Sequence, residues 1–262
     1  MNDTPIRSTE GSERCVPFVF GITAHRDLRP TDEPVLRAAV QDIIGEFHAK
    51  YPHTPMVVLC ALAEGGDTLC AEVALEAGAR VVGALPFPPQ IYRTMTSFGS
   101  EATRRRFDAL LAQDRVQHFV TPLPENRRPA DEDAWQALAA DQTERHRIYA
   151  ANGVFIARNS HGLIALWDGV GPAKPSGTAE LVVYQVSGRA PDVLAGLTEN
   201  FQWPESGLVQ HIWTPRTSRP TVVEAAGNRR ETYLSFSTKF QALAFERYLK
   251  SGLGHDFANK RL

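Results

Sequence analysis

Residues 16–23 (VPFVFGIT) form a short apolar run that ends in glycine and threonine, and they open the pattern that decides the fold. Residues 33–50 follow with apolar side chains at helical spacing, and residues 56–63 (MVVLCALA) form a second apolar run. Short uninterrupted apolar runs are typical of buried strands, and the periodic segment between them indicates an amphipathic helix. Because parallel strands must be joined by a crossover, this order predicts a parallel sheet with helices on both faces.

The alternation continues through most of the chain. Further strands are expected at residues 79–85, 116–120, 162–167 and 208–214, and further helices at 67–77, 101–113, 132–159 and from about 178. The pattern therefore predicts an α/β fold with a doubly wound, mostly parallel open sheet of Rossmann-like type and about six to seven strands.

Composition divides the chain into three parts. Residues 1–14 are polar and mixed in charge, and we expect them to form a disordered arm. Residues 15–215 contain the α/β domain. Residues 216–262 are expected to form a polar loop and a helix from about Tyr233 to Lys250, which either packs on the domain or links it to a partner. Too few apolar residues follow Arg216 to make a second core.

The overall charge argues against a polyanionic partner. The 262 residues include 28 Lys and Arg against 30 Asp and Glu, so the formal net charge is −2. Such a balance gives no general attraction for nucleic acid or anionic lipid. The hydrophobic fraction of 43% also excludes a disordered chain. We therefore expect a small-molecule ligand and no nucleic-acid partner.

Cysteine usage and the N-terminus predict a cytoplasmic protein. Cys15, Cys60 and Cys70 form no C-x-x-C pair, which favours reduced thiols and no metal site. The polar N-terminus lacks the apolar stretch of a signal peptide. The longest apolar run has eight residues, whereas a membrane span needs about twenty, so no transmembrane segment is expected. No cofactor is predicted.

Polar residues gather in the loops that follow the first, second and fifth expected strands. These loops read GITAHR at residues 21–26, AEGGDT at 63–68 and WDG at 167–169, with SGTAE following at 176–180. The carboxyl ends of parallel strands share one edge of a sheet, where helix N-termini and free N–H groups face outward. A ligand site is therefore expected at this edge.

The glycine-containing loops admit a functional and a structural interpretation. Ser176, Gly177 and Thr178 open a helix and could cradle an anion, or a hydroxyl could simply cap that helix. Asp67 and the glycines before it could contact a ribose or a phosphate, or Asp67 could serve as an N-cap. The residue types alone leave both alternatives open.

The pair His25-Arg26 is harder to explain by structure alone. Arg26 could bind phosphate oxygens with two hydrogen bonds, while His25 donates from one ring nitrogen. The alternative is a surface salt bridge from Arg26 to Asp27 or Glu33.

Tyr149 and Asn152 lie three positions apart and could share a helix face that looks into the same crevice, although a tyrosine in such a helix usually belongs to the core. The sequence contains no G-x-G-x-x-G after the first strand, no P-loop, no H-E-x-x-H and no G-x-S-x-G. Dehydrogenase, P-loop NTPase, zincin and serine-hydrolase interpretations therefore lose their main support.

Three strings taken together resemble the SLOG superfamily. They are GITAHRDL at 21–28, LAEGGDTLCAEVAL at 62–75 with LPFP at 85–88, and LIALWDG at 163–169 with SGTAE at 176–180. This Rossmann-like group includes the LOG cytokinin-activating phosphoribohydrolases, DprA and the ligand-binding N-terminal domains of TRPM channels. More narrowly, the chain resembles a bacterial branch found in predicted anti-phage and nucleotide-signalling systems.

The resemblance implies a pocket between strands one and five for a nucleotide or a nucleotide-derived signal such as an ADP-ribose derivative. Relatives carry a first motif similar to G-[IV]-T-G-H-R, in which this chain has Ala24 in place of the second glycine. Arg26 and the N–H groups at 177–178 would hold phosphate, and Glu64, Asp67 or Asp168 would accept ribose hydroxyls. The ligand-binding residues that follow are Gly21, Thr23, His25, Arg26, Glu64, Gly65, Gly66, Asp67, Asp168, Gly169, Ser176, Gly177, Thr178 and Glu180.

The alternative function is a LOG-like N-glycosidic phosphoribohydrolase. LOG enzymes carry a P-G-G-x-G-T-x-x-E motif, and counting from Gly177 places its glutamate at Leu181. Glu180 is the nearest carboxylate and would be the catalytic residue, but one position along a helix is about 100° of rotation. Binding is therefore favoured over hydrolysis. An effector protein as partner and a homo-oligomeric state both stay open.

Overall fold

The structure is a computed structural model that describes residues 16–123, 127–171, 176–188, 191–194, 207–219 and 230–233. Within these residues, seven strands form one sheet in the order β4-β3-β2-β1-β5-β6-β7. Neighbouring strands are parallel except β6 and β7, which are antiparallel. The strands are β1 (Phe18–Ala24), β2 (Met56–Cys60), β3 (Arg80–Leu85), β4 (Val116–Val120), β5 (Gly162–Trp167), β6 (Val209–Trp213) and β7 (Arg230–Tyr233).

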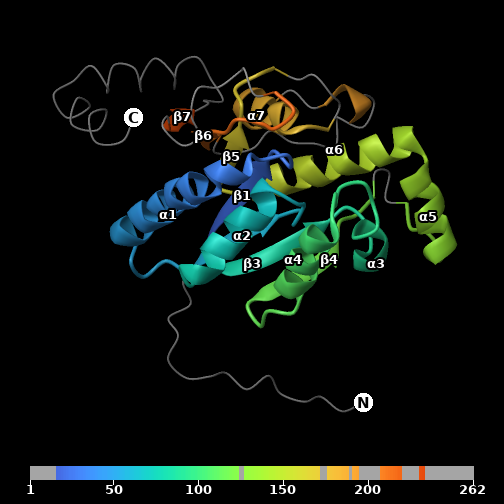
Figure 1. The fold of residues 1–262 in the computed structure, drawn as a ribbon, viewed down its shortest axis with the longest axis horizontal. Helices are drawn as coiled ribbons and strands as arrows, with labels where there is room; N and C mark the ends of the chain where they lie inside the picture. The colour runs from blue at the N-terminus through green and yellow to red at the C-terminus, as the bar shows by residue number, and fades with distance from the viewer. Residues whose placement is uncertain are drawn as a thin grey trace, which may run out of the picture.

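Helices cover both faces of this sheet (Figure 1). The α-helices are α1 (Glu33–Lys50), α2 (Gly66–Glu76), α3 (Pro89–Tyr92), α4 (Glu101–Leu111), α5 (Glu132–Ala140), α6 (Gln142–Arg158) and α7 (Thr178–Ser187). Two short 3-10 helices, η1 (Pro30–Asp32) and η3 (Asp192–Leu194), complete the described elements. None of the described helices is long and apolar enough to span a membrane.

The two helical layers contact alternate side chains of the central strand. Phe20 and Ile22 of β1 belong to the core that contains the buried residues of α1 and α2. Val19 packs against the other core, which contains buried residues of α6 and α7. This alternation is the period of a strand that is buried on both faces, so the prediction of a doubly wound, mostly parallel Rossmann-like sheet is confirmed.

Strand order reverses at β1. The chain moves from β1 outward through β2, β3 and β4, and it then returns to place β5 and β6 on the other side of β1. Phe20 of β1 pairs with Val58 of β2 and with Gly162 of β5. Crossovers that leave β1 and β5 on opposite faces open a crevice at the carboxyl ends of these strands. The topology thus fixes where a ligand site can form.

The helix expected over residues 132–159 is in fact two helices. Asp141 has extended backbone angles, φ −72° and ψ 118°, between the end of α5 and the start of α6. Its Oδ1 accepts a hydrogen bond from the Glu144 N–H at 3.0 Å, which is the geometry of an N-cap. The prediction of one helix was wrong because an aspartate can start a new helix within an otherwise periodic segment.

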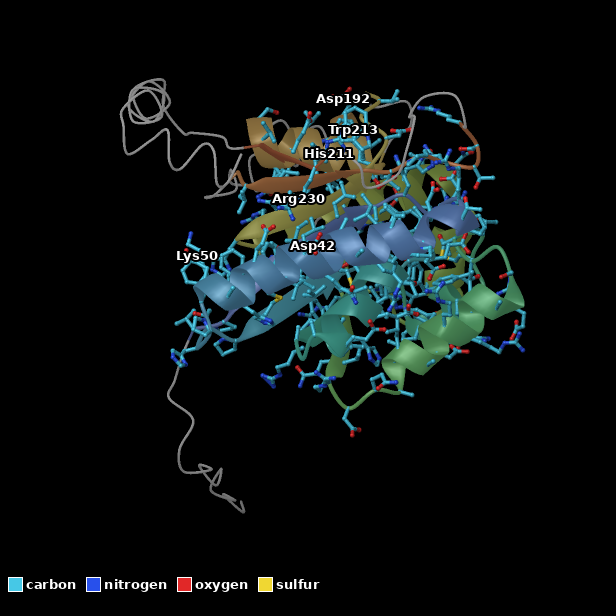
Figure 2. The ribbon with its side chains drawn as sticks, turned by 60° about the vertical axis from the view of Figure 1, so that its left-hand side comes forward. Asp42, Lys50, Asp192, His211, Trp213 and Arg230 are labelled. Atoms are coloured by element: carbon cyan, nitrogen blue, oxygen red, sulfur yellow. The ribbon has the colours of Figure 1, made fainter. Side chains whose placement is uncertain are left out.

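The C-terminal region of the sheet also differs from expectation. Tyr233, expected to begin a helix, is the last residue of β7 and pairs with Val209 of β6. Arg230 of β7 donates to Glu46 Oε1 of α1 at 2.5 Å, so the edge strand is fastened to a helix (Figure 2). The remainder of the expected helix, residues 234–250, and the expected arm at 1–14 lie outside the described residues.

Gly21 lies at the centre of the sheet, where no side chain fits. A Cβ built there would lie 2.5 Å from Ser160 Oγ and 2.6 Å from Leu163 Cδ2. Because β1 is hydrogen-bonded to β2 and β5, the strand cannot shift to relieve this contact.

Gly21→Ala should lower the free energy of unfolding by about 1–3 kcal/mol, the usual cost of overpacking a core. Gly45→Ala is the matched control, since nothing lies within 4 Å of a Cβ at this exposed position of α1. The control should be neutral or stabilise by up to about 1 kcal/mol. Urea unfolding of both variants measures the difference, and equal effects would show that packing around Gly21 is not limiting.

Candidate ligand-binding site

A cavity of about 840 Å³ lies at the carboxyl ends of β1 and β5. Six parts of the chain line it: the end of β1 with the loop after it, the loop after β2 with the start of α2, residues 92–97, one face of α6, the loop after β5 with the start of α7, and residues 216–219. Its volume falls within the range of roughly 300–1,000 Å³ that is typical of small-molecule sites. The crevice expected from the strand order is therefore present as a cavity.

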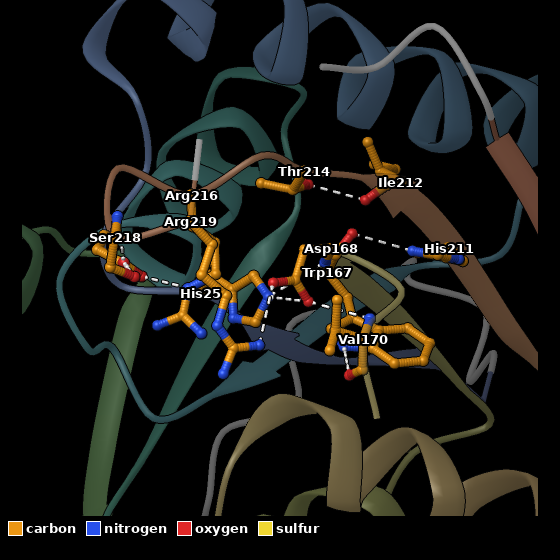
Figure 3. Close-up of polar contacts among 11 residues, drawn as sticks. His25, Trp167, Asp168, Val170, His211, Ile212, Thr214, Arg216, Ser218 and Arg219 are labelled. Atoms are coloured by element: carbon orange, nitrogen blue, oxygen red, sulfur yellow. Dashed lines mark hydrogen bonds and ion pairs between the residues drawn. The ribbon is translucent and has the colours of Figure 1, made fainter. Parts of the chain in front are cut away.

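His25 connects the ends of β1 and β5. Its N–H donates to Leu166 O at 3.0 Å, and its Nε2 accepts the Asp168 N–H at 3.1 Å. Burial lowers the pKa of His25, with a further contribution from the charge of Arg216, while Asp168 opposes the shift. A neutral ring is required for Nε2 to accept a hydrogen bond. His25 Nε2 is thus engaged within the protein rather than free to donate to a ligand (Figure 3).

Asp168 presents one satisfied and one unsatisfied oxygen. Its Oδ1 accepts the Val170 N–H at 3.2 Å and lies 3.1 Å from His25 Nε2. Its Oδ2 is buried and has no hydrogen-bond donor among the described residues. Arg219 Nη1 lies 3.9 Å from Oδ2, and the side chain of Asp168 is only 2% exposed. Burying a carboxylate oxygen without a hydrogen-bond donor costs free energy, so this oxygen is an exception among buried polar groups.

Residues 216–219, which we call the 216–219 turn, are held over the cavity by Asp27. Arg216 Nε donates to Asp27 Oδ1 at 2.8 Å, and both the N–H and the hydroxyl of Ser218 donate to Asp27 Oδ2. The Thr217 N–H donates to Asp27 O at 2.9 Å. Partial burial alone would raise the pKa of Asp27, but the bonds from Ser218 and Arg216 lower it below its usual value. Asp27 therefore acts as an ionised anchor.

The cavity lining carries an excess of positive charge. Among the described residues, four arginines line it against two aspartates and no glutamate. Arg26 donates a long hydrogen bond to Thr96 O at 3.4 Å, whereas Arg145 donates to Ala139 O at 2.8 Å. The other two arginines are those of the 216–219 turn, and their side chains extend toward His25 and Asp168 (Figure 3). This balance favours an anionic ligand.

The start of α7 also faces the cavity. Thr178 and Ala179, the first two residues of the helix, line it, and Gly177 before them has no side chain to cap the helix. Ser176 has a positive φ of 62°, and its N–H donates to the Glu180 carboxylate. Burial raises the pKa of Glu180, and the Ser176 bond opposes this shift. Glu180 stabilises the turn and is not among the residues that line the cavity.

The glycine pair before α2 has a packing role. Gly65 has a φ of 81°, and a Cβ there would lie 2.2 Å from Arg26 O. A Cβ on Gly66 would lie 2.3 Å from the Cβ of Ala24, and the Gly66 N–H donates to His25 O at 3.0 Å. Neither glycine lines the cavity. They allow α2 to pack directly on the loop that carries His25 and Arg26.

The structure thus gathers some of the sequence-predicted residues around one cavity and not others. Those that line it are Thr23, His25, Arg26, Asp67, Asp168, Ser176, Gly177 and Thr178. Those that do not are Gly21, Glu64, Gly65, Gly66, Gly169 and Glu180. Glu64 instead accepts the Gly99 N–H at 2.6 Å, and Gly169 packs against the ring of Trp213.

Sequence reasoning missed most of one wall of the cavity. Tyr149 and Asn152 do line it, but so do Gln142, Arg145 and His146 of the same helix. These five residues share one face of α6 because they lie three or four positions apart, and this spacing in the sequence could have identified them. Tyr149 shares a hydrogen bond of 2.8 Å with Ser97, and Asn152 donates to Ala84 O at 2.8 Å. The described residues contain no group of three or more His, Cys, Asp or Glu placed to hold a metal ion.

Asp67 is a buried carboxyl in the cavity wall. Burial raises its pKa to about 7 from an ordinary value of 3.8, and the bond from the Ala63 N–H and the charge of Arg26 only partly oppose this. Its Oδ2 lies 3.4 Å from the Ala63 N. The folded protein therefore holds this proton more tightly than the unfolded chain does.

The pKa of Asp67 predicts a pH-dependent stability. Between about pH 4 and pH 7 the unfolded chain loses the proton and the folded protein keeps it, so stability falls by at most roughly 1.4 kcal/mol per pH unit. Asp67→Asn removes this titration. Its stability advantage over the unmodified protein should grow from pH 4 to pH 7 and stay constant above, as measured by urea unfolding across this range. Parallel profiles for the two proteins would contradict the prediction.

Asp27→Ala should release the 216–219 turn, because it removes the acceptor for Arg216 and Ser218. We expect amide hydrogen exchange at Thr217 and Ser218 to accelerate about tenfold or more, the scale of a lost charged hydrogen bond. The His25 amide, bonded to Leu166 O, is the internal control and should exchange as before. Unchanged rates in the turn would show that Asp27 does not hold it.

Comparison with known proteins finds similarity at a low level. No protein-family model and no curated protein matches the chain. Among solved structures, the chain is similar to the DNA processing protein A (DprA) from Streptococcus pneumoniae, with 17% sequence identity and a TM-score of 0.38. The similarity covers 63% of this chain and 44% of the pneumococcal chain, so less than half of that protein's length is represented.

Proposed function

We propose that this chain binds a phosphorylated nucleotide derivative, of the ADP-ribose class, in the cavity between β1 and β5. The observation that carries the proposal is the convergence of four arginines and the uncapped start of α7 on one cavity. Arginine pairs with phosphate through two parallel hydrogen bonds, and a helix N-terminus adds oriented N–H groups. The resemblance of the loop motifs to the SLOG superfamily is consistent with this function.

The size of the cavity favours a nucleotide derivative over a bare anion. A volume of about 840 Å³ exceeds what a phosphate needs and leaves room for a sugar and a base. The wall also carries hydrogen-bonding side chains such as Ser97, Tyr149 and Thr178, which suit the neutral parts of such a ligand. A mixed lining of this kind serves recognition of one molecule at several points.

Sensing is proposed in preference to hydrolysis. The Glu180 carboxylate accepts the Ser176 N–H and does not line the cavity, so the residue that the hydrolase alternative requires is already engaged. The role we propose is that of a cytoplasmic ligand-binding domain in a bacterial defence or signalling system, where ligand capture alters contacts with an effector or with a second copy of the chain.

Arg26→Ala tests the proposed function directly. Arg26 lines the cavity and, among the described residues, makes one long hydrogen bond, to Thr96 O, so its guanidinium is available to a phosphate. The variant should bind ADP-ribose about 2 kcal/mol more weakly, roughly thirtyfold, in titration calorimetry against AMP, ADP and ADP-ribose.

Arg105→Ala is the matched control, because Arg105 is exposed on α4 and does not line the cavity. It should bind the panel as the unmodified protein does. Unchanged affinity in Arg26→Ala, or no binding of any compound to the unmodified protein, would contradict the proposal. Chromatography of the same mixtures follows free base, and steady release that Glu180→Gln abolishes would establish N-glycosidic hydrolysis instead.

A further inference from the structure

We propose that Asp168 is the hydroxyl-recognition point of the cavity, where Oδ2 accepts a hydrogen bond from a sugar hydroxyl that lies beside an arginine-bound phosphate. This inference rests on the proposed function and deepens it, since it selects a ribose-containing phosphate ester over other anions. It also selects one carboxylate from the three that the sequence offered.

The first observation is the unsatisfied oxygen itself. Asp168 lines the cavity, is 2% exposed, and its Oδ1 accepts the Val170 N–H. Oδ2 is buried without a donor among the described residues. A carboxylate oxygen accepts hydrogen bonds and cannot donate them, so its complement on a ligand is a hydroxyl or an amine and not a phosphate oxygen.

The second observation is the spacing between Oδ2 and Arg219. Arg219 Nη1 lies 3.9 Å from Oδ2, which is beyond hydrogen-bond distance. A hydroxyl can donate and accept at once, so it can donate to Oδ2 while its oxygen accepts from the arginine. This pair of neighbours, one anionic and one cationic, matches a neutral hydroxyl better than it matches any ion.

The other two carboxylates are less suited to this role. Glu64 does not line the cavity, and its Oε2 accepts the Gly99 N–H at 2.6 Å. Asp67 does line it, but its carboxyl contacts the backbone of the loop after β2. Of the three, Asp168 is the one with a buried oxygen that lacks a donor.

Arg219 is the cationic neighbour of this oxygen. Its side chain is one-third exposed, and Asp168 is the carboxylate within ion-pair distance of it among the described residues. A hydroxyl placed between Oδ2 and this guanidinium would therefore contact both groups.

Asp168→Asn tests the inference with two probes in titration calorimetry of the full chain at pH 8. The asparagine keeps an oxygen for the Val170 N–H and places an NH₂ donor where Oδ2 was. ADP-ribose should bind about tenfold more weakly, since it loses its hydroxyl acceptor. Inorganic pyrophosphate, which has the anionic centre without the sugars, should bind equally well or more tightly because a negative charge has been removed.

Asp67→Asn provides the matched control, because it removes a carboxyl from the same cavity without touching Asp168. It should shift both probes in the same direction. Thermal melting of each variant shows whether the fold is retained, and Asp168→Ala, which removes the carboxylate without adding a donor, should also lose ADP-ribose affinity selectively.

The outcomes separate the two proposals. If neither probe binds the unmodified protein, the proposed function itself fails. If both bind, and Asp168→Asn leaves the ratio of their affinities unchanged, Asp168 does not read a hydroxyl and the inference is overturned. A selective loss of ADP-ribose in Asp67→Asn and not in Asp168→Asn would also overturn it, by moving the contact to the other carboxylate.

Discussion

The pairing of β1 with β2 on one side and β5 on the other is the constraint on which the rest of the molecule depends. Both neighbours are parallel to β1, so each connection must cross a face of the sheet, and the two connections leave in opposite directions. The carboxyl ends of β1 and β5 are therefore left uncovered, and polar loops can face one another there. Strand order, and not any particular side chain, therefore determines where the cavity lies.

Side chains then give the cavity its electrostatic character. His25 joins the ends of β1 and β5 by donating to Leu166 O and accepting from the Asp168 N–H, while Asp27 anchors the 216–219 turn through Arg216 and Ser218. Most polar groups around the rim satisfy one another, as buried polar groups usually do. The oxygen of Asp168 that lacks a donor stands out against this background, and the arginines around it make the same region attractive to anions.

Local patterns were enough to predict most of the fold, and topology was enough to predict which edge of the sheet carries the cavity. The bounds of α1 follow directly from its periodic apolar residues, whereas the break at Asp141 depends on one capping bond. Within the loops, residue type alone could not distinguish residues that line the cavity from glycines that are needed for packing. Gly65 is such a glycine, because it lets the backbone of α2 approach the backbone of Arg26. The contribution of Arg216 was invisible because its anchor, Asp27, is 189 positions away in the chain.

That separation has a consequence for how the protein is made. A nascent chain that has been made as far as β5 already contains β1 and β5, the two strands whose ends flank the crevice. It would still lack the arginines that follow β6 and the contacts that fasten them to the loop after β1. During translation, then, the two arginines of the 216–219 turn join the cavity only after β6 has been made.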